Sequence, residues 1–240
     1  MMRLLFASAA ALLLTATTLD GAAEAQRRGR APVARTSPRA ATPAPNWLQR
    51  VERTAEGGYR IGNPNAAVKL IEYGSITCGH CADFSTAANR PLRDNYIRTG
   101  RVSFEYRPYL IFPSDPGIFL LLGCQGPAGF FDTVEKLYAS QAAWSGRLQA
   151  QASRIQALPP RQRMAAVVRA SGVDQLFRQR GMSQQRIDAC LADQAALRRL
   201  GEHHQRYESQ GVDGTPTFLI NGRRVDVGDW TGLEPLLRQP

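Results

Sequence analysis

Beyond residue 19, this chain of 240 residues contains no apolar run of the ~20 residues that a membrane-spanning helix needs. The start of the chain instead has the layout of a secretory signal peptide. Met1-Met2-Arg3 is basic, residues 4–19 are apolar or small, and Ala23-Glu24-Ala25 offers a small-x-small cleavage site. We therefore expect residues 1–25 to be removed after Ala25 and the rest to be exported to the periplasm, where disulfides persist.

Lysine is almost missing, since Lys69 and Lys136 are the only two among 30 basic residues. Residues 26–46 hold five arginines and no acidic residue, among many prolines and alanines, and so carry half of the formal charge of +10. Such a segment cannot bury apolar area, and we expect a disordered, extended linker. A solvated tether is favoured over a nucleic-acid contact, so no nucleic-acid partner is expected.

Cysteine is also scarce, which argues against a zinc site. Cys78 and Cys81 form one C-x-x-C pair, but Cys124 and Cys190 are isolated from it and from each other. Zinc sites of this kind need a second pair of ligands at short spacing. His203-His204 are adjacent on a predicted helix, so they point in different directions, and we assign them to a solvated helix face. No metal is expected.

The C-x-x-C pair lies where a predicted strand, residues 68–73, is followed by a predicted helix that contains Cys81. The unpaired N–H groups and the positive dipole end of that helix favour a thiolate at Cys78, and so does His80 inside the motif. Cys81 is expected to be the more buried partner that closes the disulfide. This arrangement predicts thiol–disulfide exchange.

The remaining pattern predicts an α/β protein interrupted by helices. A strand over 101–106 after the helix gives a βαβ unit and hence a parallel pair of strands, with a helix kink at Pro91. Residues 116–210 show only helical periodicity and predict an all-helical insertion of roughly ninety residues. Further expected elements are a short helix over 46–51 and strands over 57–62, 217–220 and 223–227, the last two around Asn221-Gly222. Stretches of helical period over 128–144 and 183–210 and a final helix capped by Asp229 are also expected.

Gly214-Thr215-Pro216-Thr217 lies directly before a predicted strand, where a proline cannot donate to the sheet. Pro216 can hold a cis peptide bond there and leave the Thr215 backbone free to pair with an extended substrate. Alone, this stretch is an ordinary loop. With the C-x-x-C pair upstream, it predicts the second wall of a substrate site.

Taken together, Cys78-Gly79-His80-Cys81 after a strand, a helical insertion and the segment 214–222 resemble the DsbA-like family of thiol–disulfide oxidoreductases. The resemblance implies a thioredoxin fold, a central mixed sheet flanked by helices, over 57–115 and 211–240, with an all-helical domain inserted at 116–210. It implies a cis Pro216 facing the sulfurs and a partly buried acid at Glu72. It also implies a periplasmic monomer that oxidises unfolded or reduced exported proteins and uses no cofactor besides the Cys78–Cys81 disulfide. A membrane quinone reductase of the DsbB type is then expected to re-oxidise it.

Two questions stay open at this stage. Gly-His within the motif and Thr before Pro216 are also found in isomerase-like relatives, so a disulfide isomerase or reductase competes with the oxidase. A redox-inert chaperone or adaptor is a third hypothesis, which the retention of both cysteines opposes. Cys124 and Cys190 are either a structural disulfide or two buried free cysteines, and export favours the disulfide.

Overall fold

The computed structural model describes residues 45–238. The predicted signal peptide, and the predicted linker except for Pro45 and Asn46, lie outside these residues. Six strands form one sheet in the order β1-β2-β4-β3-β5-β6. Only β3 and β4 run parallel, and every other neighbouring pair is antiparallel. The strands are β1 (Val51–Arg53), β2 (Tyr59–Gly62), β3 (Val68–Gly74), β4 (Val102–Pro108), β5 (Thr217–Ile220) and β6 (Arg223–Val225).

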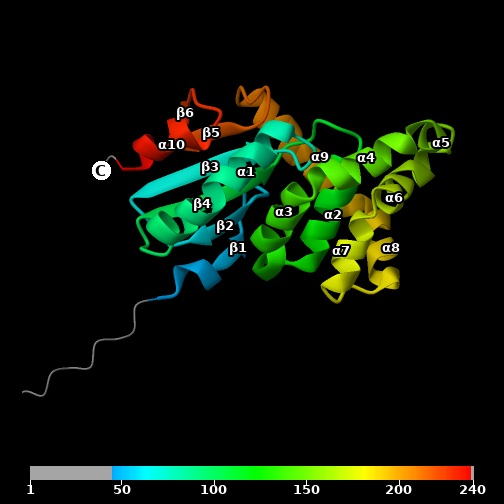
Figure 1. Cartoon of the computed structure of the whole chain (residues 1–240), viewed down its shortest axis with the longest axis horizontal. Coiled ribbons are helices and arrows are strands. Elements are labelled where there is room, and N and C mark those ends of the chain that lie inside the picture. The colour runs from blue at the N-terminus through cyan, green and yellow to red at the C-terminus, as the bar shows by residue number, and fades with distance from the viewer. Residues whose placement is uncertain (1–44, 239–240) are drawn as a thin grey trace, which may run out of the picture. The chain divides into compact units, whose positions relative to one another are not determined.

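The parallel pair β3 and β4 is the predicted βαβ unit, with α1 (Gly79–Pro91) as the crossover (Figure 1). Pro91 ends α1, and the chain continues through a π-helical turn, η2 (Leu92–Ile97). Proline accounts for this change because it has no N–H to donate to the preceding turn. The register places Glu72 of β3 between Tyr106 of β4 and Phe218 of β5. The acid therefore lies in the middle of the sheet.

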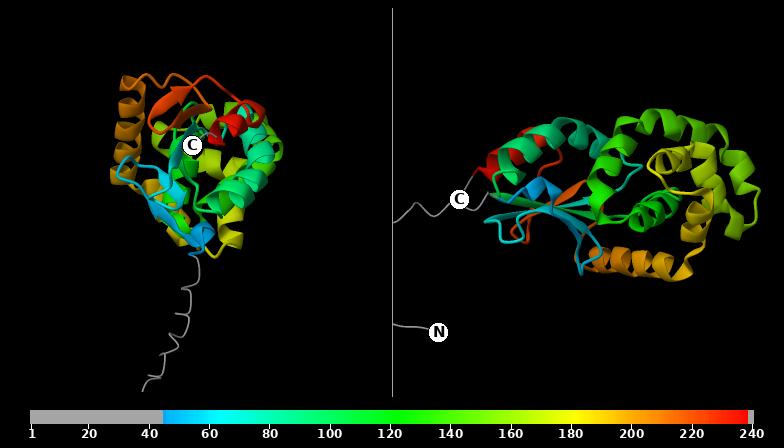
Figure 2. Two further views of the ribbon diagram at one scale, coloured as in Figure 1. Left: turned by 90° about the vertical axis from the view of Figure 1, so that its left-hand side faces the viewer. Right: turned by 90° about the horizontal axis from the view of Figure 1, so that it is seen from below.

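Helices cover the two faces of the sheet unequally. α1 and α10 (Trp230–Leu237) lie on one face, and α9 (Gln194–Ser209) lies on the other (Figure 2). On the first face the Phe84 ring packs against Phe218, with the ring centroids 4.5 Å apart. On the second face Tyr73 packs edge-on against Tyr207 at 4.9 Å. Asp229 caps α10 by accepting from the Gly232 N–H, as predicted.

The insertion between β4 and β5 is helical throughout. Ser183 accepts from the Arg186 N–H and caps the start of α8, and Asp193 accepts from the Ala196 N–H and caps α9. α9 then leads back to the sheet (Figure 1). The other helices of the insertion are α2 (Asp115–Gln125), η3 (Pro127–Gly129), α3 (Phe130–Ala139), α4 (Gln141–Ala150), α5 (Ala152–Gln156), α6 (Pro160–Ser171), α7 (Val173–Gln179) and α8 (Gln184–Ala192).

Several predicted boundaries are wrong. The expected helix over 46–51 is only one 3₁₀ turn, η1 (Trp47–Gln49), and the chain then enters β1, which adds a strand before the predicted start at residue 57. The stretches of helical period predicted over 128–144 and 183–210 each contain more than one helix. A turn at Ser140 and the Asp193 cap start new helices there, because both residue types favour helix starts over helix interiors.

Within residues 45–238 no single helix is long and apolar enough to cross a membrane. One pair of helices, Asp115–Gln125 with Pro127–Ala139, passes the same test of length and composition, but it bends by 116°. Most of the α2 side chains are buried in the core. The architecture, a mixed sheet flanked by helices with a helical domain inserted after β4, is the thioredoxin fold that the resemblance implies.

Candidate functional site

Cys78 and Cys81 lie at the junction of β3 and α1. Cys78 is the N-cap residue of α1, and Cys81 lies in the first turn. Both are unbonded thiols, so the structure shows the reduced pair. Cys78 keeps 8% of its surface exposed, whereas Cys81 has none. The predicted difference in burial is therefore present, and only Cys78 is open to attack from solvent.

Thr215 and Pro216 form the opposite wall of the site although they lie 137 and more residues downstream of Cys78. The Thr215–Pro216 peptide bond is cis. The Cys78 thiol donates to the Thr215 carbonyl oxygen at 3.4 Å. Gly214 precedes this contact, and its carbonyl accepts from the Thr217 hydroxyl at 2.8 Å, which fixes the turn before β5. The structure thus brings Cys78 and the Gly214–Pro216 turn together as predicted.

The surroundings of Cys78 favour its thiolate. Its pKa is lowered to about 5, chiefly because the Cys81 thiol donates a hydrogen bond to it. Desolvation opposes this effect, while Thr215 and the backbone N–H groups of Cys81 and His80 add to it. The Thr215 hydroxyl is buried and has no hydrogen-bond partner beside the neutral thiol. A thiolate at Cys78 gives that hydroxyl an acceptor.

His80 contributes less than the sequence suggested. Its side chain is exposed on the first turn of α1. The group of His80 that helps to lower the pKa of Cys78 is its backbone N–H. The favourable contacts therefore come from the helix start itself more than from the imidazole.

The pKa values of Cys81 and Glu72 are raised, in contrast to that of Cys78. Burial raises the pKa of Cys81 well above its ordinary value, and the hydrogen bond to Cys78 raises it further. Glu72 is also buried, and desolvation followed by repulsion from Cys78 raises its pKa to about 8. Its Oε1 atom has no hydrogen-bond partner. Glu72 lines a small cavity of about 40 Å³ with Phe84, Tyr106 and Tyr138, which is room for a water molecule.

The helical insertion holds the segment that leads into Cys78, a role that the sequence analysis missed. The buried Asp115 carboxylate accepts from the Ser75 hydroxyl at 2.9 Å and from the Thr77 hydroxyl at 2.8 Å. The Gln141 amide donates to the carbonyl oxygens of Ile76 and Cys78, each at 2.9 Å. Ser114-Asp115-Pro116 is a recognisable helix start, but nothing in the sequence links it to Thr77 or marks Gln141.

Asp115 also fixes an apolar pair beside the site. Its Oδ2 accepts from the N–H groups of Ile111 and Phe112, both at 2.9 Å. The side chains of these two residues are exposed by 44% and 45%, and they are the exposed large hydrophobic residues within 45–238. Through Asp115, these two residues are tied to the same segment as Cys78.

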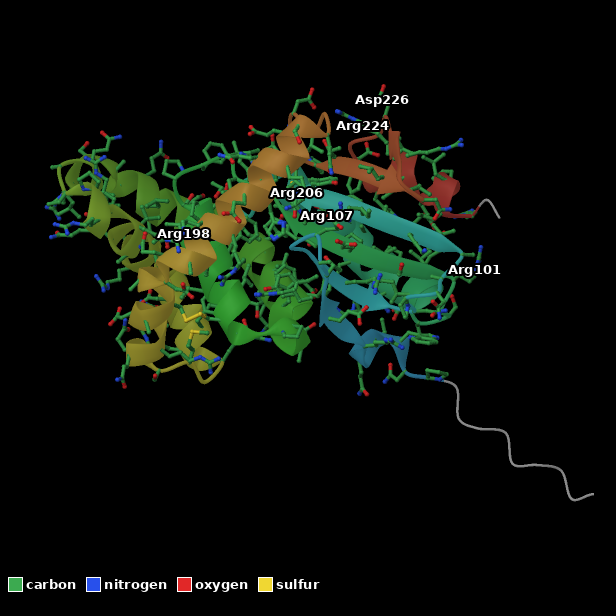
Figure 3. The ribbon with its side chains drawn as sticks, turned by 180° about the vertical axis from the view of Figure 1, so that it is seen from behind. Arg101, Arg107, Arg198, Arg206, Arg224 and Asp226 are labelled. Carbon is green, nitrogen blue, oxygen red and sulfur yellow. A yellow bond between two sulfur atoms is a disulfide. The ribbon has the colours of Figure 1, made fainter. Side chains whose placement is uncertain are left out.

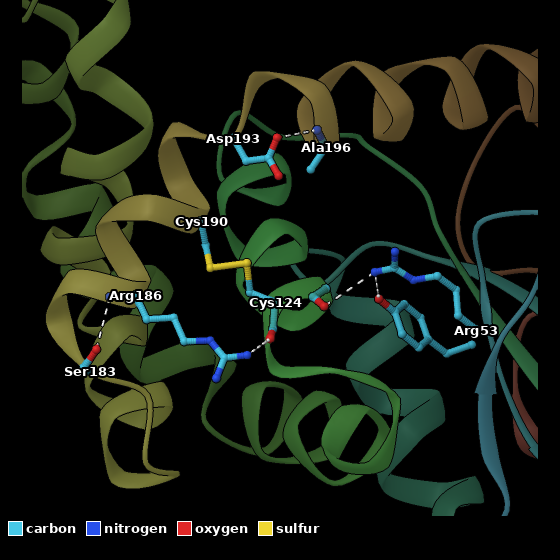
Figure 4. Close-up of a disulfide and its surroundings, with 9 residues drawn as sticks. Arg53, Cys124, Ser183, Arg186, Cys190, Asp193 and Ala196 are labelled. Atoms are coloured by element: carbon cyan, nitrogen blue, oxygen red, sulfur yellow. Dashed lines mark hydrogen bonds between the residues drawn. A yellow bond between two sulfur atoms is a disulfide. The ribbon is translucent and has the colours of Figure 1, made fainter.

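Cys124 and Cys190 are bonded to each other and stand apart from the site. Their Cα atoms are 6.2 Å apart, and the bond joins the end of α2 to α8 (Figure 4). Arg186 donates to the Cys124 carbonyl oxygen at 2.6 Å beside the bond. Of the two alternatives left open by the sequence, the structure has the disulfide.

The two adjacent histidines differ from the prediction of a solvated helix face. His203 and His204 are both partly buried on α9. The His204 Nδ1 accepts from the Leu110 N–H at 3.4 Å, and its ring packs against Tyr109. In the part of the chain that the structure describes, no group of three or more His, Cys, Asp or Glu side chains is arranged to hold a metal ion.

Comparison with known proteins places this geometry in a family. A sequence model described as thioredoxin matches residues 54–238. The solved structure of a protein-disulfide isomerase from Novosphingobium aromaticivorans superposes with a TM-score of 0.72 at 29% identity, covering 78% of this chain and 100% of that one. Alpha-DsbA1 of Wolbachia pipientis superposes with a TM-score of 0.60 at 16% identity, covering 74% and 87%.

Curated relatives match over shorter lengths. A Rickettsia typhi protein, provisionally named a protein-disulfide oxidoreductase, is 22% identical over 170 residues, which are 69% of this chain and 55% of that protein. A Rickettsia bellii protein with the same provisional name is 27% identical over 86 residues, 35% of this chain. The chain spans about a third of the length of that relative, 33%.

The fold and the site define a thioredoxin-fold protein with a dithiol at a strand–helix junction and a cis-proline opposite to it. The chain belongs to the thioredoxin family, and it shares its fold, including the helical domain inserted after β4, with alpha-DsbA1 of Wolbachia.

Proposed function

We propose that this protein is a thiol–disulfide oxidoreductase that works as a dithiol oxidase, introducing disulfides into other exported proteins. The observation that carries the proposal is the contrast within the Cys78–Cys81 pair. Cys78 has a pKa of about 5, whereas that of the buried Cys81 is raised. A stable Cys78 thiolate lowers the free energy of the reduced protein, and a protein whose reduced form is stabilised is a good oxidant.

The reaction begins from the Cys78–Cys81 disulfide. A substrate thiolate attacks Cys78 Sγ, which forms a mixed disulfide and breaks the bond to Cys81. Cys81 leaves with the electron pair and takes up a proton, because its raised pKa disfavours a lasting thiolate. Glu72 is the buried acid coupled to Cys81, and with a pKa of about 8 it carries a proton at neutral pH that it can pass on.

A second substrate thiolate then attacks the substrate sulfur of the mixed disulfide. Cys78 leaves as a thiolate, which its low pKa makes a good leaving group. Two substrate thiols have become a disulfide, and the protein has gained two electrons and holds one thiolate and one thiol. The remaining proton is released to solvent. No bound cofactor is required.

Two features beside the sulfurs suit an extended polypeptide substrate. The Thr215 carbonyl and N–H lie at the entry of β5, where a substrate strand can pair with them. Ile111 and Phe112 offer exposed apolar surface, which unfolded chains recognise and folded proteins mostly lack. Reduced, unfolded proteins are therefore the proposed substrates.

Location and partners follow from the same proposal. The signal-peptide layout of residues 1–25 supports export to the periplasm. There, a membrane quinone reductase of the DsbB type is the proposed re-oxidant, and the protein is proposed to act as a monomer without nucleic acid. Fusing residues 1–45 to alkaline phosphatase, which is active only after export, tests the location. Fusion to residues 26–45 alone is the control.

A disulfide isomerase is the second candidate, because the Novosphingobium structure of 29% identity is described as one. The two functions predict different results with ribonuclease. An oxidase restores activity to the reduced enzyme but not to the scrambled, fully disulfide-bonded one, whereas an isomerase rescues the scrambled enzyme. We expect oxidation without unscrambling. Rescue of scrambled ribonuclease would favour the isomerase, and failure in both assays would favour a redox-inert chaperone.

A further inference from the structure

A second cavity, separate from the thiol site, lies between the sheet and the helical insertion. Its volume is about 310 Å³, within the range of small-molecule pockets and far more than one water needs. It shares no lining residue with the smaller cavity at Glu72, and neither Cys78 nor Thr215 lines it. The β1–β2 hairpin, the end of β4, α2 and α9 each contribute to its wall.

The inner wall of this cavity is apolar. Tyr59, Phe119 and Leu120 line it and are each about 95% buried, with exposed fractions of 4%, 5% and 5%. Leu200 of α9 adds a further aliphatic side chain. A hydrocarbon body placed here would be removed from water against aromatic and aliphatic carbon.

Two arginines line the cavity. Arg53 lines the cavity, donates to the Tyr59 hydroxyl at 2.7 Å and to the Gly123 carbonyl oxygen at 3.5 Å, and lies 5.4 Å from the centre of the Tyr59 ring (Figure 4). Arg199 enters the wall from α9. Among the ion pairs within residues 45–238, neither arginine has a carboxylate partner. Both guanidinium groups therefore have N–H donors to offer a ligand.

The cavity also contains a buried polar atom that has no hydrogen-bond partner. His203 lines the same cavity, and its Nδ1 is buried without a hydrogen-bond partner. The ring packs closely on the Gly57 backbone, since a Cβ at Gly57 would lie 2.5 Å from its Cδ2 atom. Buried polar atoms in proteins are almost always satisfied, so a ligand or water is expected to supply the missing partner.

We propose that this cavity binds a small amphiphilic monocarboxylate, with its carboxylate between Arg53 and Arg199 and its apolar body against Phe119 and Leu120. Asp193 also lines the cavity, and its negative charge limits how many negative charges a ligand can carry. The Asp193 carboxylate already caps α9 through the Ala196 N–H, and it leaves the cavity with two positive charges and one negative. One negative charge on the ligand balances this set, whereas the two or more negative charges of hydrogenphosphate or a nucleotide would exceed it.

Isothermal titration of the full chain with octanoate tests the proposal, with octanol and inorganic phosphate as comparison probes. We expect saturable one-to-one binding of octanoate, with octanol at least about tenfold weaker because it cannot use the guanidinium groups. Absence of saturable octanoate binding up to about 10 mM would overturn the proposal. Tighter binding of octanol or phosphate than of octanoate would also overturn it.

Variants locate the binding within the molecule. The double substitution Arg53→Gln and Arg199→Gln should weaken octanoate binding at least about tenfold, since charge-assisted hydrogen bonds are lost. Arg198→Gln is the matched control, because Arg198 is an exposed neighbour on α9 that does not line the cavity (Figure 3). It should leave the affinity unchanged, and an equal loss in the control would show that binding depends on general surface charge.

A variant that fills the cavity tests the proposal while Arg53 and Arg199 stay in place. Ala196→Phe adds a ring to the α9 wall and should abolish octanoate binding. If this variant does not fold, the nitrogen resonance of the His203 ring in the unaltered protein serves instead, and octanoate should shift it while octanol shifts it less. Unchanged binding in a folded Ala196→Phe variant, or a His203 resonance unmoved at saturation, would place the ligand elsewhere.

Discussion

The two cysteine pairs of this protein are made of the same residue type and occupy opposite environments. Cys78 and Cys81 are close in sequence and unbonded, at a helix start that offers donors to sulfur. Cys124 and Cys190 are 66 residues apart and bonded, tying α2 to α8 within the insertion. The first pair has the surroundings of a reactive thiolate, whereas the second cross-links two helices. Surroundings, not residue type, assign the chemistry.

The largest expected effect is on exchange activity. Cys78→Ser should reduce the oxidation of reduced ribonuclease to the uncatalysed rate, because the attacked sulfur is gone and serine cannot replace it. The double substitution Cys124→Ser and Cys190→Ser should retain the exchange reaction when assayed well below its unfolding temperature. A folded double variant without activity would break the proposed division between the two pairs.

For stability, in contrast, we expect the Cys124–Cys190 pair to matter more than the Cys78–Cys81 pair. Removing the Cys124–Cys190 bond by the same double substitution should lower the free energy of unfolding by about 4 kcal/mol, since a loop of 66 residues is no longer closed in the unfolded chain. Urea denaturation at equilibrium measures this change. Cys78→Ser is the control and should change the midpoint much less. A double variant as stable as the wild type would refute a stabilising role for this bond.

The pH dependence of the redox potential is the third comparison, because only the first pair titrates. The lowered pKa of Cys78 stabilises the reduced protein fully above the unfolded thiol value of about 8.5, and this stabilisation is lost as pH falls through about 5. Between these values reduction takes up one proton per two electrons, so the potential should fall by about 30 mV per pH unit. Below pH 5 two protons are taken up, and the slope should double.

Equilibration with glutathione at several pH values measures this slope, and thiolate absorbance gives the pKa of Cys78 directly. A smaller bend is expected near pH 8, because the pKa of Glu72 is raised partly by a Cys78 charge that only the reduced protein carries. A slope of about 60 mV per unit from pH 5 to 8 would mean that Cys78 has an ordinary thiol pKa.

Local sequence patterns predicted the parts of the site that a short stretch encodes. The strand, the two cysteines and the helix follow one another within β3 and α1, so the chain order itself builds the junction. The turn at Thr215–Pro216 was predicted because a proline before a strand can hold a cis peptide bond and because the C-x-x-C pair upstream gave that turn a site to complete. The parallel pairing of β3 with β4 also follows from local order, since a helix connects them.

Contacts between distant segments could not be predicted in this way. Asp115 and Gln141 bond the residues around Cys78 from two helices of the insertion, and neither carries a periodic or motif signal for that role. The helix breaks at Ser140 and Asp193 were not predicted, because a polar residue between two stretches of helical period can equally lie inside one helix. Which face of α9 is buried, and hence the position of His203, depends on the packing of both halves of the chain.

The smallest expected effect concerns His80. The sequence predicted that its side chain favours the Cys78 thiolate, whereas in the structure that side chain is exposed. His80→Ala should make the protein less oxidising by about 10–20 mV, because the interaction of an exposed imidazole with a neighbouring thiolate is screened by solvent. Arg90→Gln, which removes an exposed cation near the other end of α1, is the matched control and should leave the potential unchanged. An unchanged potential in His80→Ala would assign the stabilisation of the thiolate to Cys81, Thr215 and the helix backbone. A fall of more than about 60 mV would instead mean that the imidazole acts on Cys78 far more strongly than its exposed position implies.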